Sequence, residues 1–102
     1  METYNILFTL NSSIFKRLSS KENIDIKKIF EECVKNFNGN VISFFLMIGG
    51  EHNCATIIEV KDKIKLASLI LELRKINYLD NYKVYNMFSN SEFKKFIKDI
   101  KG

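Results

Sequence analysis

Hydrophobic and polar residues alternate along some segments of the chain, form an almost continuous apolar run at residues 41–48, and recur every three or four positions along others. Alternation with a period of two is typical of a half-buried β-strand, and a spacing near 3.6 is typical of an amphipathic helix. The pattern predicts strands at residues 3–10, 41–48, 53–60 and 82–88, a short helical turn at 14–18, and helices at 22–37, 62–76 and 89–100.

Polar residues and glycines mark the ends of the predicted elements. Asp62 has the short side chain that accepts hydrogen bonds at a helix N-terminus, and residues 89–92, Ser-Asn-Ser-Glu, match a capping box. Gly39 is predicted to end the helix before it in the left-handed conformation. Gly49 and Gly50 predict a tight turn between the second and third strands, because glycine tolerates a positive φ.

The order of these elements is strand, helix, strand, strand, helix, strand, followed by one more helix. Two strand–helix–strand units joined by a hairpin form the ferredoxin-like plait, an α+β fold. Right-handed crossovers place both connecting helices on one face of a four-stranded antiparallel sheet. We therefore predict a single domain over residues 1–102, in which one face of the sheet is covered and the other is bare.

The predicted second strand is apolar on both of its faces. A sheet with one solvated face normally carries polar residues at alternate positions. At roughly 25 cal/mol per Å² of apolar surface, leaving several large side chains exposed forgoes several kcal/mol. We expect the bare face to be covered by the last helix folding back or by a second copy in a two-fold dimer, and we favour the dimer. One face carries Ile42, Phe44, Leu46 and Ile48, and the other carries Val41, Phe45 and Met47.

Basic residues outnumber acidic ones, so the net charge is +4. Solvated helix faces account for this excess, and the alternative is an electrostatic footprint for nucleic acid or anionic lipid. An RNA-recognition sheet displays aromatic side chains, whereas the predicted strand 53–60 has none and contains Glu59. We predict neither a nucleic-acid partner nor a membrane partner. Lysines concentrate in two predicted helices, at positions 61, 63, 65, 94, 95, 98 and 101.

The two cysteines, Cys33 and Cys54, do not have the spacing of a metal site. The chain opens with Met1-Glu2-Thr3, without the basic stretch and apolar core of a secretory signal. No apolar run is long enough to span a bilayer. We therefore expect a cytoplasmic protein with two free thiols, no metal and no cofactor.

Three residues are candidates for ligand binding: Tyr4, His52 and Asn53. His52 is the one histidine of the sequence and would act as a general base or a lone metal ligand, or else lie exposed in the turn. Asn53 would contact a ligand or cap the turn through its amide. Tyr4 would line a small-molecule pocket between sheet and helices, or belong to an ordinary packed core. No catalytic residue is assigned.

The predicted turn between the second and third strands contains Gly50-Glu51-His52-Asn53. Other distinctive segments are residues 3–7, Gly39, residues 44–49, residues 57–60 with Asp62, and residues 88–89 before residues 92–93. With these segments the chain resembles the GYD-domain family of small bacterial and archaeal proteins, which is named for a Gly-x-Tyr-Asp turn. In this chain His52 stands in place of the tyrosine of that turn and Asn53 in place of the aspartate. The resemblance implies a ferredoxin-like fold of the dimeric α+β barrel group, in which two sheets pack face to face. It implies no particular activity.

Two hypotheses about function follow. The first is a homodimeric, non-catalytic module that pairs through its bare sheet face and binds a small molecule or a protein partner. The second is an enzyme of the dimeric α+β barrel group that acts on a small aromatic or apolar compound in a pocket between sheet and helices. The second hypothesis requires a sizeable enclosed cavity with His52 or a tyrosine at its mouth.

Overall fold

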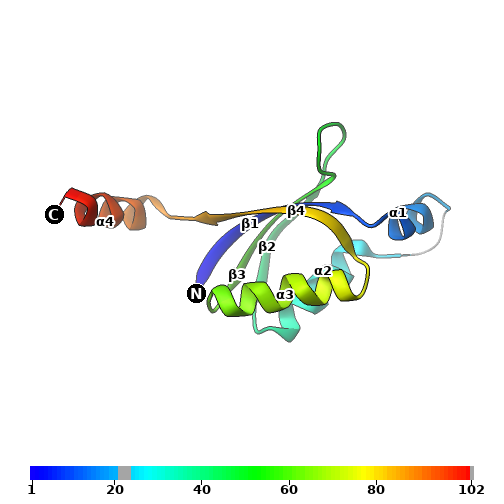
Figure 1. Cartoon of the computed structure of the whole chain (residues 1–102), viewed down its shortest axis with the longest axis horizontal. Coiled ribbons are helices and arrows are strands. Elements are labelled where there is room, and N and C mark those ends of the chain that lie inside the picture. The colour runs from blue at the N-terminus through cyan, green and yellow to red at the C-terminus, as the bar shows by residue number, and fades with distance from the viewer. Residues whose placement is uncertain (21–23, 102) are drawn as a thin grey trace.

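A computed structural model describes residues 1–20 and 24–101, which form one antiparallel sheet with two helices packed against one face (Figure 1). The strands are β1 (Glu2–Leu10), β2 (Asn40–Leu46), β3 (Cys54–Val60) and β4 (Leu79–Met87), and the helices are α1 (Ser12–Ser19), α2 (Ile26–Asn36), α3 (Lys63–Lys75) and α4 (Asn90–Lys101). The strand order is β2-β3-β1-β4, with α2 and α3 on the same side. The predicted ferredoxin-like α+β fold is confirmed.

Short polar side chains cap the helices. Asp25 accepts a hydrogen bond from a backbone N–H of the first turn of α2 at 3.0 Å, and the predicted start at residue 22 lies outside the described residues. Asp62 caps α3 in the same way at 3.0 Å, as predicted. Before α4, Ser89 and Glu92 exchange two side chain–backbone hydrogen bonds of 3.0 and 3.2 Å, which confirms the capping box.

The turn between α2 and β2 corrects the prediction for Gly39. Asn38 takes the left-handed conformation instead, with a φ of 59°. A Cβ atom on Gly39 would lie 2.6 Å from the backbone oxygen of Glu59, and 2.9 and 2.8 Å from side-chain carbons of Val34 and Val60. Glycine is therefore required here because the chain passes so close to β3, not because of its φ.

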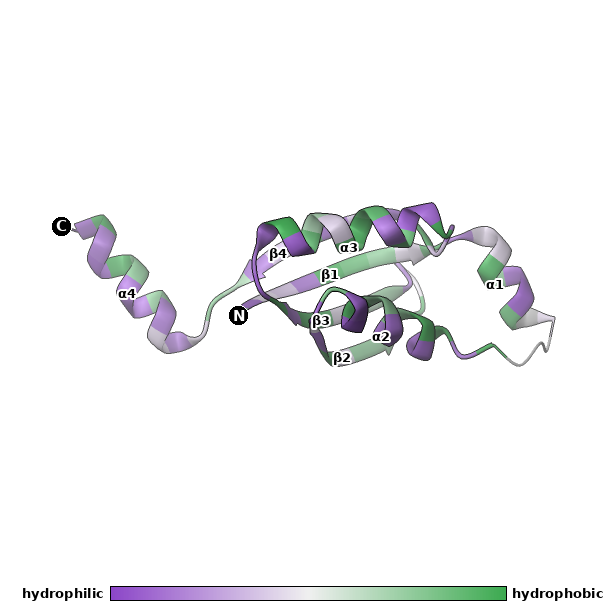
Figure 2. Cartoon of the chain, turned by 90° about the horizontal axis from the view of Figure 1, so that it is seen from below, coloured by the Kyte–Doolittle hydropathy of each residue, from purple (hydrophilic) through white to green (hydrophobic). Residues whose placement is uncertain are grey.

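The core lies between the sheet and the helices α2 and α3, which cover the sheet in Figure 2. The predicted alternation along β1 and β3 is confirmed, because every second residue of each strand is buried. β1 contributes Tyr4, Ile6, Phe8 and Leu10 to the core, and β3 contributes Cys54, Thr56, Ile58 and Val60.

β4 begins at Leu79, three residues earlier than predicted. The turn after α3 is short because Asn77 takes a left-handed φ of 57° and reverses the chain. Tyr78 follows it, is fully buried, and donates a 2.6 Å hydrogen bond from its hydroxyl to the backbone oxygen of Ile26. This bond joins the entry of β4 to the first turn of α2.

A β-bulge in β2 changes which of its residues share a face. Val41 and Ser43 pair with consecutive residues of β3, so Ile42 is an extra residue on this strand. The bulge shifts the alternation by one position, and Val41 and Phe44 both pack toward the helices. The predicted assignment of Val41 to the side of Phe45 is therefore wrong.

α4 projects beyond the end of β4 and away from the rest of the molecule (Figure 1). The helix has no buried residue, and the molecule measures 56 × 30 × 18 Å along its principal axes. The last helix therefore does not fold back over the bare face of its own sheet.

Candidate functional site

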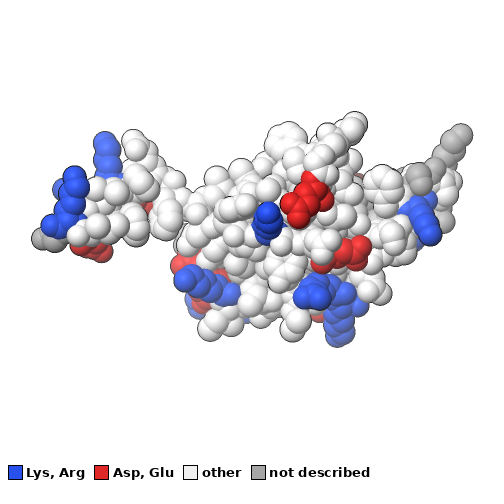
Figure 3. Space-filling model, turned by 45° about the horizontal axis from the view of Figure 1, so that its top comes forward, with Lys and Arg blue, Asp and Glu red and all other residues white. Residues whose placement is uncertain are grey.

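The sheet face opposite α2 and α3, which we call the open face, is left uncovered by the described part of the chain (Figure 1). Side chains of residues paired across an antiparallel sheet point to the same side, so the register identifies its members. Large apolar and aromatic members come from all four strands, and in Figure 3 this side is mostly uncharged around a basic and an acidic side chain near its centre. These members are Leu7, Phe45, Ile57, Tyr85 and Met87, and they are interspersed with Thr3, Asn5, Thr9, Ser43, Glu59 and Lys83.

Phe45 and Tyr85 are the most exposed of the large apolar and aromatic side chains of the open face. Phe45 is 64% exposed on the edge strand β2, and Tyr85 is 51% exposed on the opposite edge strand β4. Between them, Leu7 and Ile57 are half-buried. An apolar surface that crosses a whole sheet, with polar residues among its members, is typical of an interaction surface.

His52 ties the β2–β3 hairpin to the end of β1. Its Nδ1 atom lies 3.3 Å from Thr9 Oγ1, and the Thr9 hydroxyl donates to the backbone oxygen of Glu51 at 3.1 Å. Because the hydroxyl has only one proton, Thr9 accepts from Nδ1 of His52 when it donates to Glu51. Nε2 is buried and has no hydrogen-bond partner within the described residues. His52 is therefore a buried hairpin residue, not an exposed one.

Asn53 continues the same attachment. Its side-chain Oδ1 accepts a 2.9 Å hydrogen bond from the backbone N–H of Leu10, and its own backbone N–H donates to the backbone oxygen of Phe8 at 3.2 Å. Its backbone oxygen accepts from Met47 at 2.8 Å, which closes the base of the hairpin. The amide thus holds two elements together, so a ligand contact by Asn53 would have to use its remaining NH₂ group.

Tyr4 lies apart from this pair. It is buried on the helix side of β1, and its hydroxyl donates to the carboxylate of Glu2. Burial, and then the hydrogen bond and negative charge of Glu2, raise the pKa of Tyr4 to about 12. Thr9, which contacts His52, is five positions further along β1, or about 16 Å at the rise of a strand. The structure therefore brings His52 and Asn53 together and leaves Tyr4 outside, and their role in ligand binding stays a prediction.

Four aromatic side chains fill the space between the sheet and α2. Phe8, Phe30, Phe44 and Tyr78 pack in contact, with ring centroids 5.5–6.4 Å apart. This is the region in which the enzyme hypothesis requires a cavity. The rings pack against one another and fill the space between β1 and α2.

An apolar groove of about 450 Å³ lies between α1 and the β2–β3 hairpin, and sequence reasoning did not find it. Phe15 and Leu18 of α1 form one wall, and Met47 and Ile48 of the hairpin form another. The one indication in the sequence was the three-residue spacing of Phe15 and Leu18, which places both on one side of a helix. The segment is too short for this spacing to predict an apolar surface. Asn53 also lines the groove, so the hairpin attachment and the groove are neighbours.

Cys33 and Cys54 are buried free thiols, as predicted. Burial raises the pKa of both, that of Cys54 to about 12. Within residues 1–20 and 24–101, no group of three or more His, Cys, Asp and Glu side chains is arranged to hold a metal ion. The helices of this same part of the chain lack the length and apolar character needed to cross a membrane.

No family model and no curated protein matches the chain. Solved structures do match it. The structure described as FFRP-DM1 is 17% identical with a TM-score of 0.56, and the match covers 86% of this chain and all of that one. A protein of Thermus thermophilus, TTHA0845, is 12% identical with a TM-score of 0.55, over 87% of this chain and 95% of that one.

A third structure, MtbAldR, is 13% identical with a TM-score of 0.58, over 87% of this chain but only 53% of the other. This chain therefore spans about half of that protein. At these identities the likeness shows the fold alone, and it agrees with the ferredoxin-like topology. The GYD-domain resemblance is not matched by a family model and stays a prediction.

Proposed function

We propose that the protein is a homodimeric, non-catalytic binding module whose two copies pack their open faces together. The observation that carries this proposal is the exposure of Phe45 and Tyr85 at opposite edges of an uncovered sheet. Burying such side chains contributes roughly 25 cal/mol per Å² of apolar surface. A two-fold pair covers both open faces with one contact and leaves no further open face.

The charges near the open face support such a pair. Lys83 and Glu51 lie 3.6 Å apart and have opposite signs, so this region offers no block of like charge to repel a second copy. Their side chains are 55% and 72% exposed, so both charges remain accessible to a partner.

The resemblance to the GYD-domain family supports the same assembly, because it implies two sheets packed face to face. We extend the proposal to residues 1–102 as one cytoplasmic GYD-like domain. For a small-molecule or protein ligand, the proposed contacts are His52, Asn53 and Tyr4. Asn53 lines the apolar groove, and the neighbouring His52 has a buried Nε2 without a hydrogen-bond partner among the described residues.

Size-exclusion chromatography with light scattering tests the assembly. At micromolar concentration the full-length chain is expected at twice its mass of 12.0 kDa. Phe45→Asp places a charge in the proposed interface and is expected to give a folded monomer. Leu71→Asp is the matched control, because Leu71 is 70% exposed on α3, on the other side of the sheet. A folded wild-type monomer would overturn the proposal, and so would equal dissociation by both variants.

A further inference from the structure

α4 has two chemically different sides, and its apolar side is unpartnered within the described residues. One side carries aromatic and aliphatic residues, and the other carries lysines, as the alternation of green and purple along α4 shows (Figure 2). At 100° per residue, the apolar residues fall within about one third of the circumference. They are Phe93, Phe96, Ile97 and Ile100, and the basic ones are Lys94, Lys95, Lys98 and Lys101.

The apolar side, which we call the α4 stripe, is exposed although its rings contact each other. Phe96 lies between Phe88 and Phe93, with ring centroids 5.9 and 6.1 Å apart. Even so, Phe96 is 46% exposed and Ile100 is 66% exposed, and α4 has no buried residue. These contacts order the aromatic residues among themselves but leave a hydrophobic surface in water.

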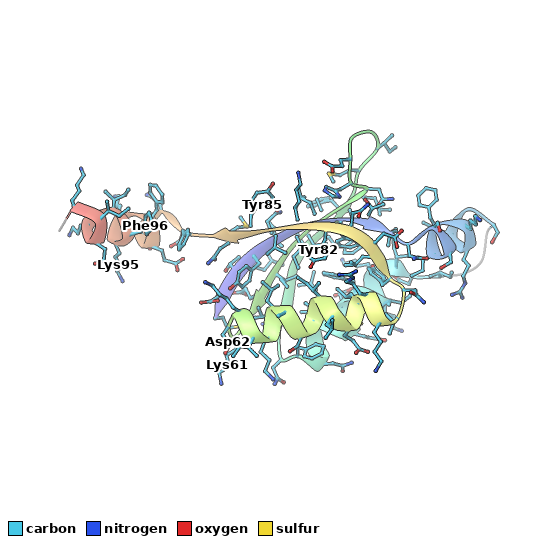
Figure 4. The ribbon with its side chains drawn as sticks, in the orientation of Figure 1. Lys61, Asp62, Tyr82, Tyr85, Lys95 and Phe96 are labelled. Atoms are coloured by element: carbon cyan, nitrogen blue, oxygen red, sulfur yellow. The ribbon has the colours of Figure 1, made fainter. Side chains whose placement is uncertain are left out.

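The stripe and the open face look toward the same side of the molecule. In Figure 4, Phe96 lies on the upper side of α4 and Lys95 on the lower side. On β4, Tyr85 of the open face lies above the strand and Tyr82, which pairs with a helix-side residue of β1, lies below it. A body placed on the open face therefore approaches the stripe from the side on which it is apolar.

The chain cannot use the stripe to cover its own open face in this conformation. Only residues 88 and 89 separate β4 from α4, and the hydrogen bonds between Ser89 and Glu92 fix the start of the helix. α4 consequently leaves the sheet in the direction of β4 (Figure 1). Its apolar partner is therefore not found within the described part of the chain.

The size of the interface points to a second copy of the chain. Four strands about 4.8 Å apart and about 25 Å long give the open face a footprint of about 480 Å². A standard interface buries about 800 Å² on each partner. A helix of this length, about 18 Å by about 10 Å, adds about 180 Å² from each copy. This footprint is a projected area, and the accessible surface of protruding side chains is larger, so the open face is at most close to the size of a standard interface, which the two arms would enlarge.

From these observations we infer that α4 is an arm that packs its stripe on the second copy and completes the dimer interface. This inference rests on the proposed open-face dimer. A lipid surface is the competing partner, because an amphipathic helix rich in lysine and phenylalanine also binds anionic membranes. The second copy is favoured because the open face contains Asn5, Ser43 and Glu59, whose polar groups suit a protein interface better than acyl chains.

Sedimentation velocity on full-length variants tests the arm. The double substitution Phe96→Ser with Ile100→Ser removes the stripe, and Lys95→Ser with Lys98→Ser is the matched control on the same helix. The first is expected to raise the dimer dissociation constant at least tenfold, and the second to change it less than twofold. Phe96→Leu keeps the stripe apolar and is expected to stay within threefold of wild type. Far-UV circular dichroism checks that each variant keeps its helix content.

Each outcome separates the two proposals. A wild-type dimer whose dissociation constant is unchanged by Phe96→Ser with Ile100→Ser overturns the arm and leaves the open-face dimer standing. A folded wild-type monomer overturns both. Cosedimentation of wild type with phosphatidylserine-containing vesicles, abolished by the stripe variant while dimerisation is unaffected, would assign α4 to a lipid surface and overturn the inference.

Discussion

The rings of Phe8 and Phe30 stack with their centroids 5.6 Å apart and their planes inclined by 20°, which joins β1 to α2 at the centre of the core. Both side chains are fully buried. Phe44 and Tyr78 pack around the same pair. The stack joins the sheet and α2 into one packed unit.

Phe30→Ala is expected to destabilise the protein by about 3–5 kcal/mol, because it removes a fully buried ring and leaves a cavity. Phe15→Ala is the control, since Phe15 is 51% exposed on α1. Urea denaturation followed by circular dichroism measures both. A loss below about 1 kcal/mol for Phe30→Ala would show that the aromatic cluster is not packed as described.

Gly39→Ala is expected to cost about 1–3 kcal/mol of stability, because the new Cβ overpacks the contact with Glu59 and the chain must move. Asn38→Gly is the control, since glycine adopts the observed φ of 59° without steric cost, and it is expected to remain close to wild type. Thermal unfolding compares the two variants. Equal losses would contradict the assignment of the steric constraint to Gly39.

Asn53→Ala is expected to destabilise the protein by about 1–2 kcal/mol, because the backbone N–H of Leu10 loses its acceptor. Asn53→Asp keeps an oxygen at the same position and restores the residue of the Gly-x-Tyr-Asp turn, so it is expected to remain near wild type. Both variants change residue 53, but only Asn53→Asp retains an acceptor oxygen. The difference between their unfolding midpoints therefore measures the contribution of the hydrogen bond to Leu10. If Asn53→Ala were as stable as wild type, the hairpin attachment would not depend on it.

Stability is expected to fall as the pH rises above about 9. Burial raises the pKa of Cys54 from 9.0 to about 12, so the unfolded chain releases this proton at a pH where the folded protein retains it. The unfolded state then binds fewer protons, and the free energy of unfolding decreases by up to about 1.4 kcal/mol per pH unit for one such group.

Urea midpoints at pH 8 and pH 10 test this dependence. Cys54→Ala is expected to lose less stability than wild type between these two values, although the loss of the buried sulfur leaves the variant less stable at both. Tyr4, whose pKa is also raised to about 12, adds to the decrease only above its ordinary pKa of 10.0. A wild-type midpoint that is constant from pH 8 to pH 10 would contradict the burial of the thiol.

Local patterns were sufficient to predict most of the elements. The alternation along β1 and β3 assigned their buried faces, because side chains of successive strand residues point to opposite sides whatever the rest of the fold does. Asp62 and the pair Ser89 and Glu92 marked helix starts, because capping bonds join residues three positions apart. The order of elements then restricted the topology to very few arrangements.

The candidate site depended on more distant contacts. His52 is held in the fold by its contact with Thr9, which lies 43 positions earlier in the chain. Glycine is needed at position 39 because the backbone there lies against Glu59 and Val60 of β3. The extra residue Ile42 reveals itself only when β2 is paired with β3, because a bulge is a mismatch between two strands and not a property of one.

The sequence by itself therefore determined the periodic elements, their caps and the plait, all of which follow from backbone geometry over a few residues. Only the tertiary structure decided that the open face stays uncovered by the described part of its own chain and that α4 points away from it. The physical reason is that an apolar stripe can be recognised from local spacing and indicates a surface that needs a partner. The position of that surface depends on the direction in which the chain leaves β4, which local spacing does not determine.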